Sequence, residues 1–131
     1  MPFRFRFLAL VPVLSAGACS RAPVPPAPVT FNKDVAPIVF ANCAPCHRPG
    51  EVAPFPLLSY ADAAKHAEGM AEETRKRHMP PWLPERGEFP ILGERRLTGE
   101  QISTIQRWVD GGKLEGDPAH LPRAPVFPEG W

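Results

Sequence analysis

Apolar residues recur at helical spacing in three separate stretches of the chain. The first stretch follows Asn32 and Asp34, either of which can cap a helix that runs to about Asn42. Pro37 is tolerated there because it falls in the opening turn. One side of this helix is apolar and consists of Val35, Ile38 and Val39. The pattern predicts a short first helix that ends at the cysteine motif of residues 43–47.

The second stretch begins at a capping box. Ser59 and Asp62 have the required spacing, and the helix that they predict runs to about Arg77. The apolar face of this helix is small and flat, and consists of Ala63, Ala67, Met70 and Ala71. Residues 79–97 then contain four prolines and two glycines, which predicts a wrapped loop.

The third stretch has the clearest boundaries. Thr98 and Gln101 form a second capping box, and Gly111 with Gly112 supplies the stop. Between them an apolar face recurs at helical spacing: Ile102, Ile105, Trp108 and Val109. Three main helices, long proline-rich loops and no convincing strand predict an all-α fold.

The composition adds two constraints. Nineteen prolines break the chain into short pieces, so the core is small and a domain near this size is only marginally stable from it. We therefore expect a bound group, in addition to side chains, to fill the centre of the domain. Lys and Arg total 15 against 14 Asp and Glu, for a net charge of +1, without a basic stripe of interleaved aromatics. A nucleic-acid partner is not expected.

Residues 1–18 have the three parts of an export signal. Arg4 and Arg6 make the start basic, residues 7–14 form an apolar run too short to span a bilayer, and residues 16–18 are an A-x-A cleavage site. We expect this signal peptide to be removed. The mature protein is then periplasmic, or anchored at the membrane and facing the periplasm.

Cleavage would make Cys19 the first residue, and two interpretations of it stay open. A cysteine after small residues ends bacterial lipoprotein signals, and its lipid would attach the protein to a membrane, but a plain A-x-A cut explains the same residues. Residues 19–30 form a proline-rich linker ahead of a domain over residues 31–117. Residues 118–131 are a C-terminal tail or the start of a further linker.

The stretch Cys43-Ala-Pro-Cys46-His47 combines two thiols with an imidazole. C-x-x-C-H is the attachment signature of c-type haem. Two thiols one short turn apart can reach two vinyl groups on one porphyrin edge, while His47 places a ring nitrogen under the iron. The other ring nitrogen needs an acceptor, for which we expect a carbonyl of residues 54–56. The motif predicts one covalent haem c held by Cys43, Cys46 and His47.

Other sites could use the same cysteines. A Cys43–Cys46 disulfide suits an oxidising compartment, and a thioredoxin-like pair shares the spacing. Neither needs His47, and the βαβ pattern of thioredoxin is missing. A zinc site would need more ligands at regular spacing, and no second close pair is offered by His66, His78 and His120. We therefore favour haem attachment.

The iron has a second axial position, for which four residues compete. Met70 and His66 fall inside the second predicted helix, where a core methionine and a surface histidine are the ordinary interpretation. Met79 lies where that helix must end, because the residue before Pro80 is disfavoured in the α region. The pattern favours Met79 as the ligand, with His78 as the serious rival. The choice sets the reduction potential.

Three segments together resemble a known family. Residues 43–47, residues 77–82 with the sequence RHMPPW, and the helix through residues 108–112 are similar to a small class I cytochrome c domain. Such domains occur in exported bacterial proteins ahead of a copper-dependent, ascorbate-using monooxygenase-like domain. The resemblance covers about residues 31–117. It implies the all-α cytochrome c fold, crossed first and last helices, and an axial pair formed by the histidine of the first segment and the methionine of the second.

Two functions of different classes follow for a chain with one haem. The first, which we favour, is a monohaem c-type cytochrome that passes single electrons to or from an exported redox partner protein and is not itself an enzyme. The second is a haem enzyme, or a gas or peroxide sensor, in which Met79 or His78 leaves the iron. Polar groups near that position would be Arg75, Arg77 and His78. A non-haem disulfide module is a third interpretation.

Overall fold

A computed structural model of the chain describes residues 27–82, 89 and 91–128. The predicted signal peptide and most of the predicted linker, which begins at Cys19, lie outside the described residues. The last three residues of the predicted tail, 129–131, also lie outside them.

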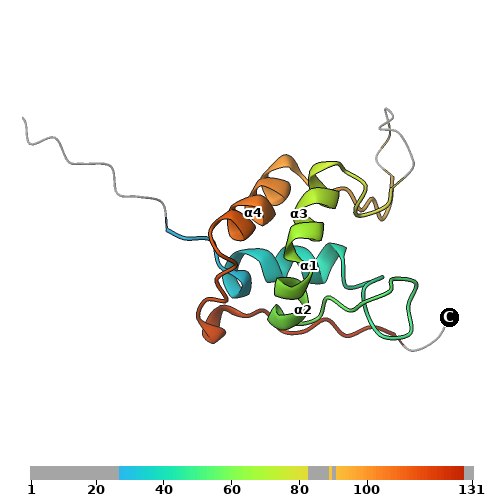
Figure 1. Ribbon diagram of the computed structural model, residues 1–131. Helices are drawn as coiled ribbons and strands as arrows, with labels where there is room; N and C mark the ends of the chain where they lie inside the picture. Colours follow the sequence, from blue (N-terminus) through green and yellow to red (C-terminus); the bar gives the residue numbers. More distant parts are fainter. Residues whose placement is uncertain (1–26, 83–88, 90, 129–131) are drawn as a thin grey trace, which may run out of the picture.

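Every regular element in the described part of the chain is helical. The order is η1, α1, α2, α3, α4 and η2, and these residues form no strand (Figure 1). The prediction of an all-α chain is confirmed at that level. None of the helices described is long and apolar enough to cross a membrane.

The first helical segment starts earlier than predicted. η1 is a π-helical turn over Phe31–Val35, and α1 continues it over Ala36–Asn42. Thr30 is the N-cap residue, and its backbone N–H donates to Asp34 Oδ2 at 2.8 Å. Asn32 is buried, and its side-chain N–H donates to a carbonyl of the C-terminal segment. The predicted cap at Asn32 or Asp34 is therefore wrong, because both side chains serve other contacts.

The second predicted helix is divided in two. α2 covers Tyr60–Lys65 and α3 covers Ala67–Arg75, while His66 between them leaves the helical region with φ −110° and ψ 14°. Half of the predicted capping box is present, since Ser59 Oγ accepts a hydrogen bond from the backbone N–H of Asp62 at 3.1 Å. Oδ2 of Asp62 accepts from the backbone N–H of Leu58 at 3.2 Å, in place of the predicted bond from Ser59. Position 66 carries neither proline nor glycine, so the local pattern gave no sign of the division.

α4, Gly99–Asp110, matches its predicted boundaries. Thr98 Oγ1 accepts a hydrogen bond from the backbone N–H of Gln101 at 3.1 Å, and Gln101 Oε1 accepts one from the Thr98 N–H at 2.8 Å. The helix ends at the predicted glycine pair and buries the side chains of Ile105 and Trp108. The capping box thus fixes where this helix begins.

Buried residues of η1, α1, α3 and α4 together form the core. The ring centroid of Phe31 is 5.8 Å from that of Trp108 and 5.7 Å from that of Tyr60. α3 and α4 lie side by side, and Gln106 Nε2 donates to the carbonyl of Ala71 at 2.6 Å (Figure 1). The first and last main helical segments are therefore in direct contact through Phe31 and Trp108.

The C-terminal segment returns along the first helix. The backbone N–H of Phe31 donates to the carbonyl of Leu114 at 2.8 Å. Gly116 has a φ of +86°, and a Cβ added there would lie 2.6 Å from the Cβ of Thr30, so only glycine fits this crossing. The short 3-10 turn η2, Pro118–His120, follows.

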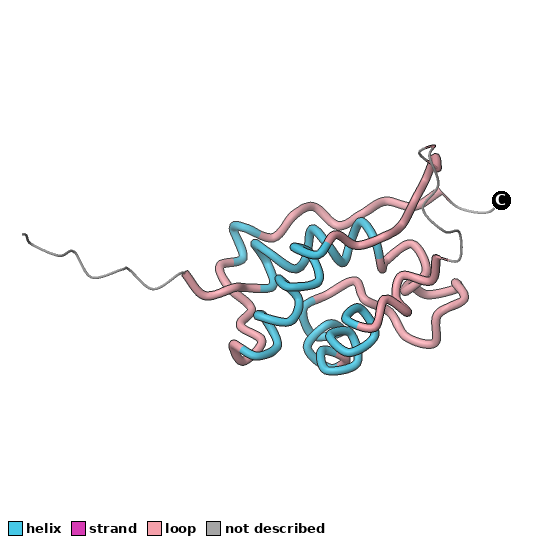
Figure 2. The backbone as a smooth tube through the Cα atoms, turned by 90° about the horizontal axis from the view of Figure 1, so that it is seen from above, coloured by secondary structure: helices cyan, strands magenta, loops and turns pink. Residues whose placement is uncertain are grey.

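The same segment then reaches the loop that follows the cysteine motif. The guanidinium carbon of Arg48 lies 4.2 Å from the ring centroid of Phe127, at cation–π distance. Figure 2 shows the helices gathered in one body with long loops at one end of it. The tail thus runs from η1 to the neighbourhood of the cysteine motif.

Candidate functional site

The cysteine motif forms a tight turn at the C-terminal end of α1. Cys43 is the C-cap residue of this helix. Its carbonyl accepts hydrogen bonds from the backbone N–H groups of Cys46 at 3.0 Å and His47 at 2.8 Å. All three side chains line one cavity, and both thiols are free. The predicted attachment residues are therefore together in space.

The two thiols have different surroundings. Burial raises the pKa of Cys43 to about 11, and the nearby Cys46 adds a smaller electrostatic effect in the same direction. Cys43 therefore stays protonated at neutral pH. Cys46 is approached by Arg95, whose Nη1 lies 3.6 Å from its Sγ. The sequence gave no sign of this contact, which joins residues 49 positions apart.

The imidazole of His47 is oriented by the proline-rich loop of residues 48–58, which follows the cysteine motif. Its Nδ1 lies 3.1 Å from the carbonyl oxygen of Phe55. An Nδ1–H that donates to this carbonyl fixes the tautomer and leaves Nε2 with a lone pair for a metal ion. The loop is held in turn by the backbone N–H of Leu57, which donates to the His47 carbonyl at 2.8 Å. The predicted acceptor within residues 54–56 is confirmed.

The ring of Phe55 contacts two histidine rings. Its centroid is 4.7 Å from that of His47, with an interplanar angle of 47°, and 3.8 Å from that of His66, with an angle of 12°. His66 also lines the cavity. This grouping was not predicted, because the three rings come from separate predicted elements and no local spacing relates them.

A second part of the cavity wall comes from α3 and from the residues that follow it. Met79, Pro80 and Pro81, which we call the methionine strap, line the cavity. Met79 is 41% exposed. Met70 lines the cavity as well, but it is 8% exposed and belongs to the core cluster. Three of the four candidate iron ligands, Met79, Met70 and His66, thus face the same space.

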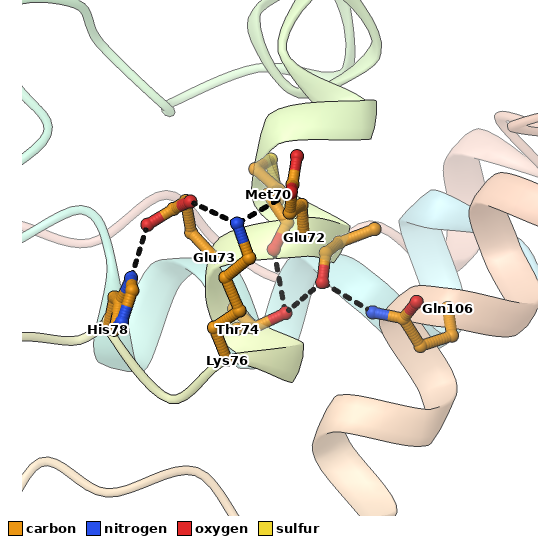
Figure 3. Close-up of polar contacts among 8 residues, drawn as sticks. Met70, Glu72, Glu73, Thr74, Lys76, His78 and Gln106 are labelled. Atoms are coloured by element: carbon orange, nitrogen blue, oxygen red, sulfur yellow. Dashed lines mark hydrogen bonds and ion pairs between the residues drawn. The ribbon is translucent and has the colours of Figure 1, made fainter.

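His78, the fourth candidate, does not line the cavity. Its side chain is 65% exposed, and its Nδ1 lies 3.2 Å from Oε2 of Glu73 on α3 (Figure 3). Glu73 itself lines the cavity and is 41% exposed, and Lys76 Nζ also lies near its carboxylate. In this arrangement Met79 lines the cavity directly, whereas His78 contacts a carboxylate at its edge.

The cavity that these residues share has a volume of about 670 Å³. This volume lies within the range of about 300–1,000 Å³ that is typical of small-molecule and cofactor sites. Its walls are mostly apolar and come from the end of α1, the proline-rich loop, α3 and the methionine strap. The charged side chains on them are Lys65, Glu68, Glu73 and Arg95.

The metal-ligating side chains of the described residues do not gather into a cluster of the usual kind. Among these residues, no group of three or more His, Cys, Asp or Glu side chains could hold a metal ion. The part of the chain described therefore does not build a zinc site of the usual type.

Sequence reasoning missed the role of Arg48, the residue after His47. Its Nη2 lies 2.7 Å from Glu51 Oε1, and its Nε donates to the carbonyl of Pro45 at 3.4 Å. Its guanidinium also stacks on Phe127. Arg48 therefore joins the cysteine turn, the proline-rich loop and the C-terminal tail. Its place beside His47 is the one signal that could have drawn attention to it.

No family model, no curated protein and no solved structure matches the chain.

Proposed function

We propose that this protein is an exported monohaem c-type cytochrome that transfers single electrons to or from a redox partner protein. One observation carries the proposal: Cys43, Cys46 and an oriented His47 share a mostly apolar cavity with Met79. Two attachment thiols, an imidazole and a thioether are the protein groups that hold haem in a c-type cytochrome with His/Met ligation. Haem c is accordingly the cofactor that we assign to the cavity.

The residues present fit this cofactor. The cavity has a suitable volume, and its apolar walls suit a porphyrin face. Nδ1 of His47 lies 3.1 Å from the carbonyl oxygen of Phe55, and a metal-ligating histidine usually donates the N–H of its other ring nitrogen to such a carbonyl. Trp82, directly after the methionine strap, has a buried indole N–H for which the described residues supply no hydrogen-bond acceptor. A donor in this state is satisfied when a carboxylate, such as those that haem carries, lies within reach.

Each of the four residues named above has its own role in the proposal. Cys43 and Cys46 would hold the cofactor by two thioether bonds, with each S–H added across a vinyl group so that no oxidant is consumed. His47 would ligate through Nε2, with its ring orientation set by the Phe55 carbonyl. Met79 would supply a thioether that favours the reduced metal. When bound, the haem supplies the one-electron ferrous/ferric couple.

We also propose the cytochrome c fold for residues 31–117. Its support is the helical architecture and the contact of the first and last main helical segments through Phe31 and Trp108. Export to the periplasm is supported by the sequence of residues 1–18. Cys19 is the position at which a lipid would anchor the mature protein to a membrane.

A second function is favoured by the exposure of Met79, the proposed second ligand of the iron. Met79 is 41% exposed, so little packing opposes its movement away from the cavity. A displaceable ligand would suit a haem enzyme or a sensor of a diatomic gas or peroxide. Carbon monoxide separates the two functions, since a reduced electron carrier with a firmly bound Met79 should bind it only slowly, whereas a sensor should bind it readily.

The deciding experiment is expression of the full chain together with a haem-attachment system. We expect a coloured protein whose denatured mass exceeds that of the processed chain, which begins at Cys19, by one haem. Its reduced spectrum should be that of a six-coordinate, low-spin c-type cytochrome. The matched control is Cys19→Ser, which removes a cysteine outside the motif and should leave haem attachment unchanged. A colourless wild-type protein with the mass of the bare chain would refute the proposal.

A further inference from the structure

The residue two positions before Met79 has an unusual backbone conformation. Arg77 has a φ of 59°, in the left-handed region that glycine normally occupies. It lies just past the end of α3. The backbone N–H of His78 donates to the carbonyl of Glu73 at 3.0 Å, and that of Arg77 donates to the carbonyl of Thr74 at 3.0 Å. This pair of hydrogen bonds is the Schellman motif that commonly ends a helix.

Glycine is the usual residue at this point of the motif, because it has no Cβ to clash. The chain uses glycine at four other described positions of positive φ, namely Gly50, Gly93, Gly112 and Gly116. Lys113 is the other described exception, and its side chain forms an ion pair with Glu68. An arginine kept in a left-handed conformation therefore calls for a contact of its own.

The contact that Arg77 makes is with the far end of the long loop. Its Nη1 donates to the carbonyl oxygen of Leu97 at 3.3 Å. The side chain of Leu97 is buried, with 3% exposure, and it directly precedes the N-cap residue of α4. The hydrogen bond thus ties the turn just before the methionine strap to a buried residue of the core, 20 positions further along the chain.

The geometry points to Arg77 as a positioning residue that holds Met79 toward the cavity. This inference rests on the proposed function, in which Met79 is the distal ligand. Met79 is 41% exposed, so its own packing restrains it little. Its backbone N–H donates to the Glu73 carbonyl at 3.2 Å, within the turn that Arg77 makes. Arg77 therefore fixes the strap at its first residues, and the Leu97 carbonyl fixes Arg77.

The test uses three variants of the haem-loaded full chain. Arg77→Ala removes the side-chain hydrogen bond but keeps the steric cost of the left-handed conformation. Arg77→Gly removes the hydrogen bond and this steric cost as well. The matched control is Lys113→Gly, which relieves the same type of backbone conformation at the end of α4. The rate of carbon monoxide binding to the reduced protein is measured for each, because it reports how often Met79 has left the iron. Thermal unfolding is measured in parallel.

We expect Arg77→Ala and Arg77→Gly to bind carbon monoxide about tenfold faster than the wild type, the effect of losing roughly one hydrogen bond. Arg77→Gly should nevertheless melt about 4 °C higher than Arg77→Ala, because glycine suits the left-handed turn. Lys113→Gly should change the melting temperature and leave the rate at the wild-type value.

Two results would overturn the inference. One is a wild-type rate in both Arg77 variants, and the other is an equal rise in Lys113→Gly. Either result leaves the proposed function standing if the wild-type protein itself carries covalent haem and binds carbon monoxide slowly. A wild-type protein that has no haem fails the proposed function instead, so the two failures are distinguishable.

Discussion

Nδ1 of His47 lies 3.1 Å from the carbonyl oxygen of Phe55, and the ring of the same phenylalanine contacts the imidazole of His47 as well. Two different parts of one residue therefore act on the histidine. The backbone carbonyl fixes the tautomer and orientation of the ring, and the side chain packs against it. A substitution at position 55 changes the packing and keeps the carbonyl, so the two effects can be separated.

Phe55→Ala should retain covalent haem and histidine ligation but lower the free energy of unfolding by about 2 kcal/mol, less than for a fully buried phenylalanine. The reason is that contacts to His47 and His66 are lost while the hydrogen bond to the carbonyl remains. Denaturant unfolding followed at the haem absorbance measures the change. Phe89→Ala, at a ring that is 80% exposed, is the control and should have little effect. Loss of haem attachment in Phe55→Ala would show that the ring itself is required.

Cys43→Ala and Cys46→Ala should each leave at most one thioether bond and sharply lower the yield of folded protein. The core of the described part is small, so the domain depends on a bound group to complete it. Intact mass after denaturation and the yield from matched cultures give the measurement. Yields equal to that of the wild type for both variants would contradict this dependence.

The sequence predicted those parts of the fold and site that depend on local chemistry. The capping box at Thr98 and the turn of the cysteine motif both use residues within a few positions of each other. A carbonyl of residues 54–56 was also predicted as the acceptor for His47, and the carbonyl of Phe55 takes this place. Met79 was placed at a helix end by the rule for residues before proline, and α3 does end before it.

The remaining features depend on contacts between distant segments. The break at His66 accompanies its stacking on Phe55, which comes from the preceding loop. Asn32 looked like a cap but is drawn into a hydrogen bond with Gly116. Such pairings depend on how the helices pack, and no spacing in the sequence encodes them. The export signal and Cys19 fall outside the described residues and stay predictions.

The ion pair between Glu68 and Lys113 predicts a pH dependence of stability. The hydrogen bond from Lys113 lowers the pKa of Glu68 below its ordinary value of 4.5. A carboxylate with a lowered pKa in the folded state stabilises the protein above the unfolded value, and this contribution is lost as the pH falls through the folded pKa. Wild type should therefore exceed Glu68→Gln in stability near neutral pH, and the difference should vanish in acid below that pKa.

A double-mutant cycle checks the source of this dependence. Once Glu68→Gln has been made, the further change Lys113→Met should cost less than it does in the wild type, because the pair is already broken. Thermal unfolding at several pH values gives all four stabilities. A stability difference between wild type and Glu68→Gln that does not change with pH would rule out the ion pair as its cause.

The last prediction concerns the distal ligand. Met79→Ala should abolish the weak sulfur-to-iron charge-transfer band of the oxidised protein, open the reduced protein to carbon monoxide and lower the reduction potential. Each effect follows from loss of a thioether that favours ferrous iron. The band, the rate of carbon monoxide binding and the potential are measured on the same preparations.

Two control variants make the assignment to Met79 specific. His78→Ala should leave all three observables nearly unchanged, because the side chain of His78 is 65% exposed and is held by Glu73. Met70→Leu should keep the band and lose only a little stability, since Met70 is 8% exposed in the core and leucine has a similar volume. A band that survives in Met79→Ala and disappears in Met70→Leu would move the ligand to α3. A site that opens only in His78→Ala would make the pair bis-histidine, and the expected potential would then be lower because a second imidazole favours ferric iron more than a thioether does.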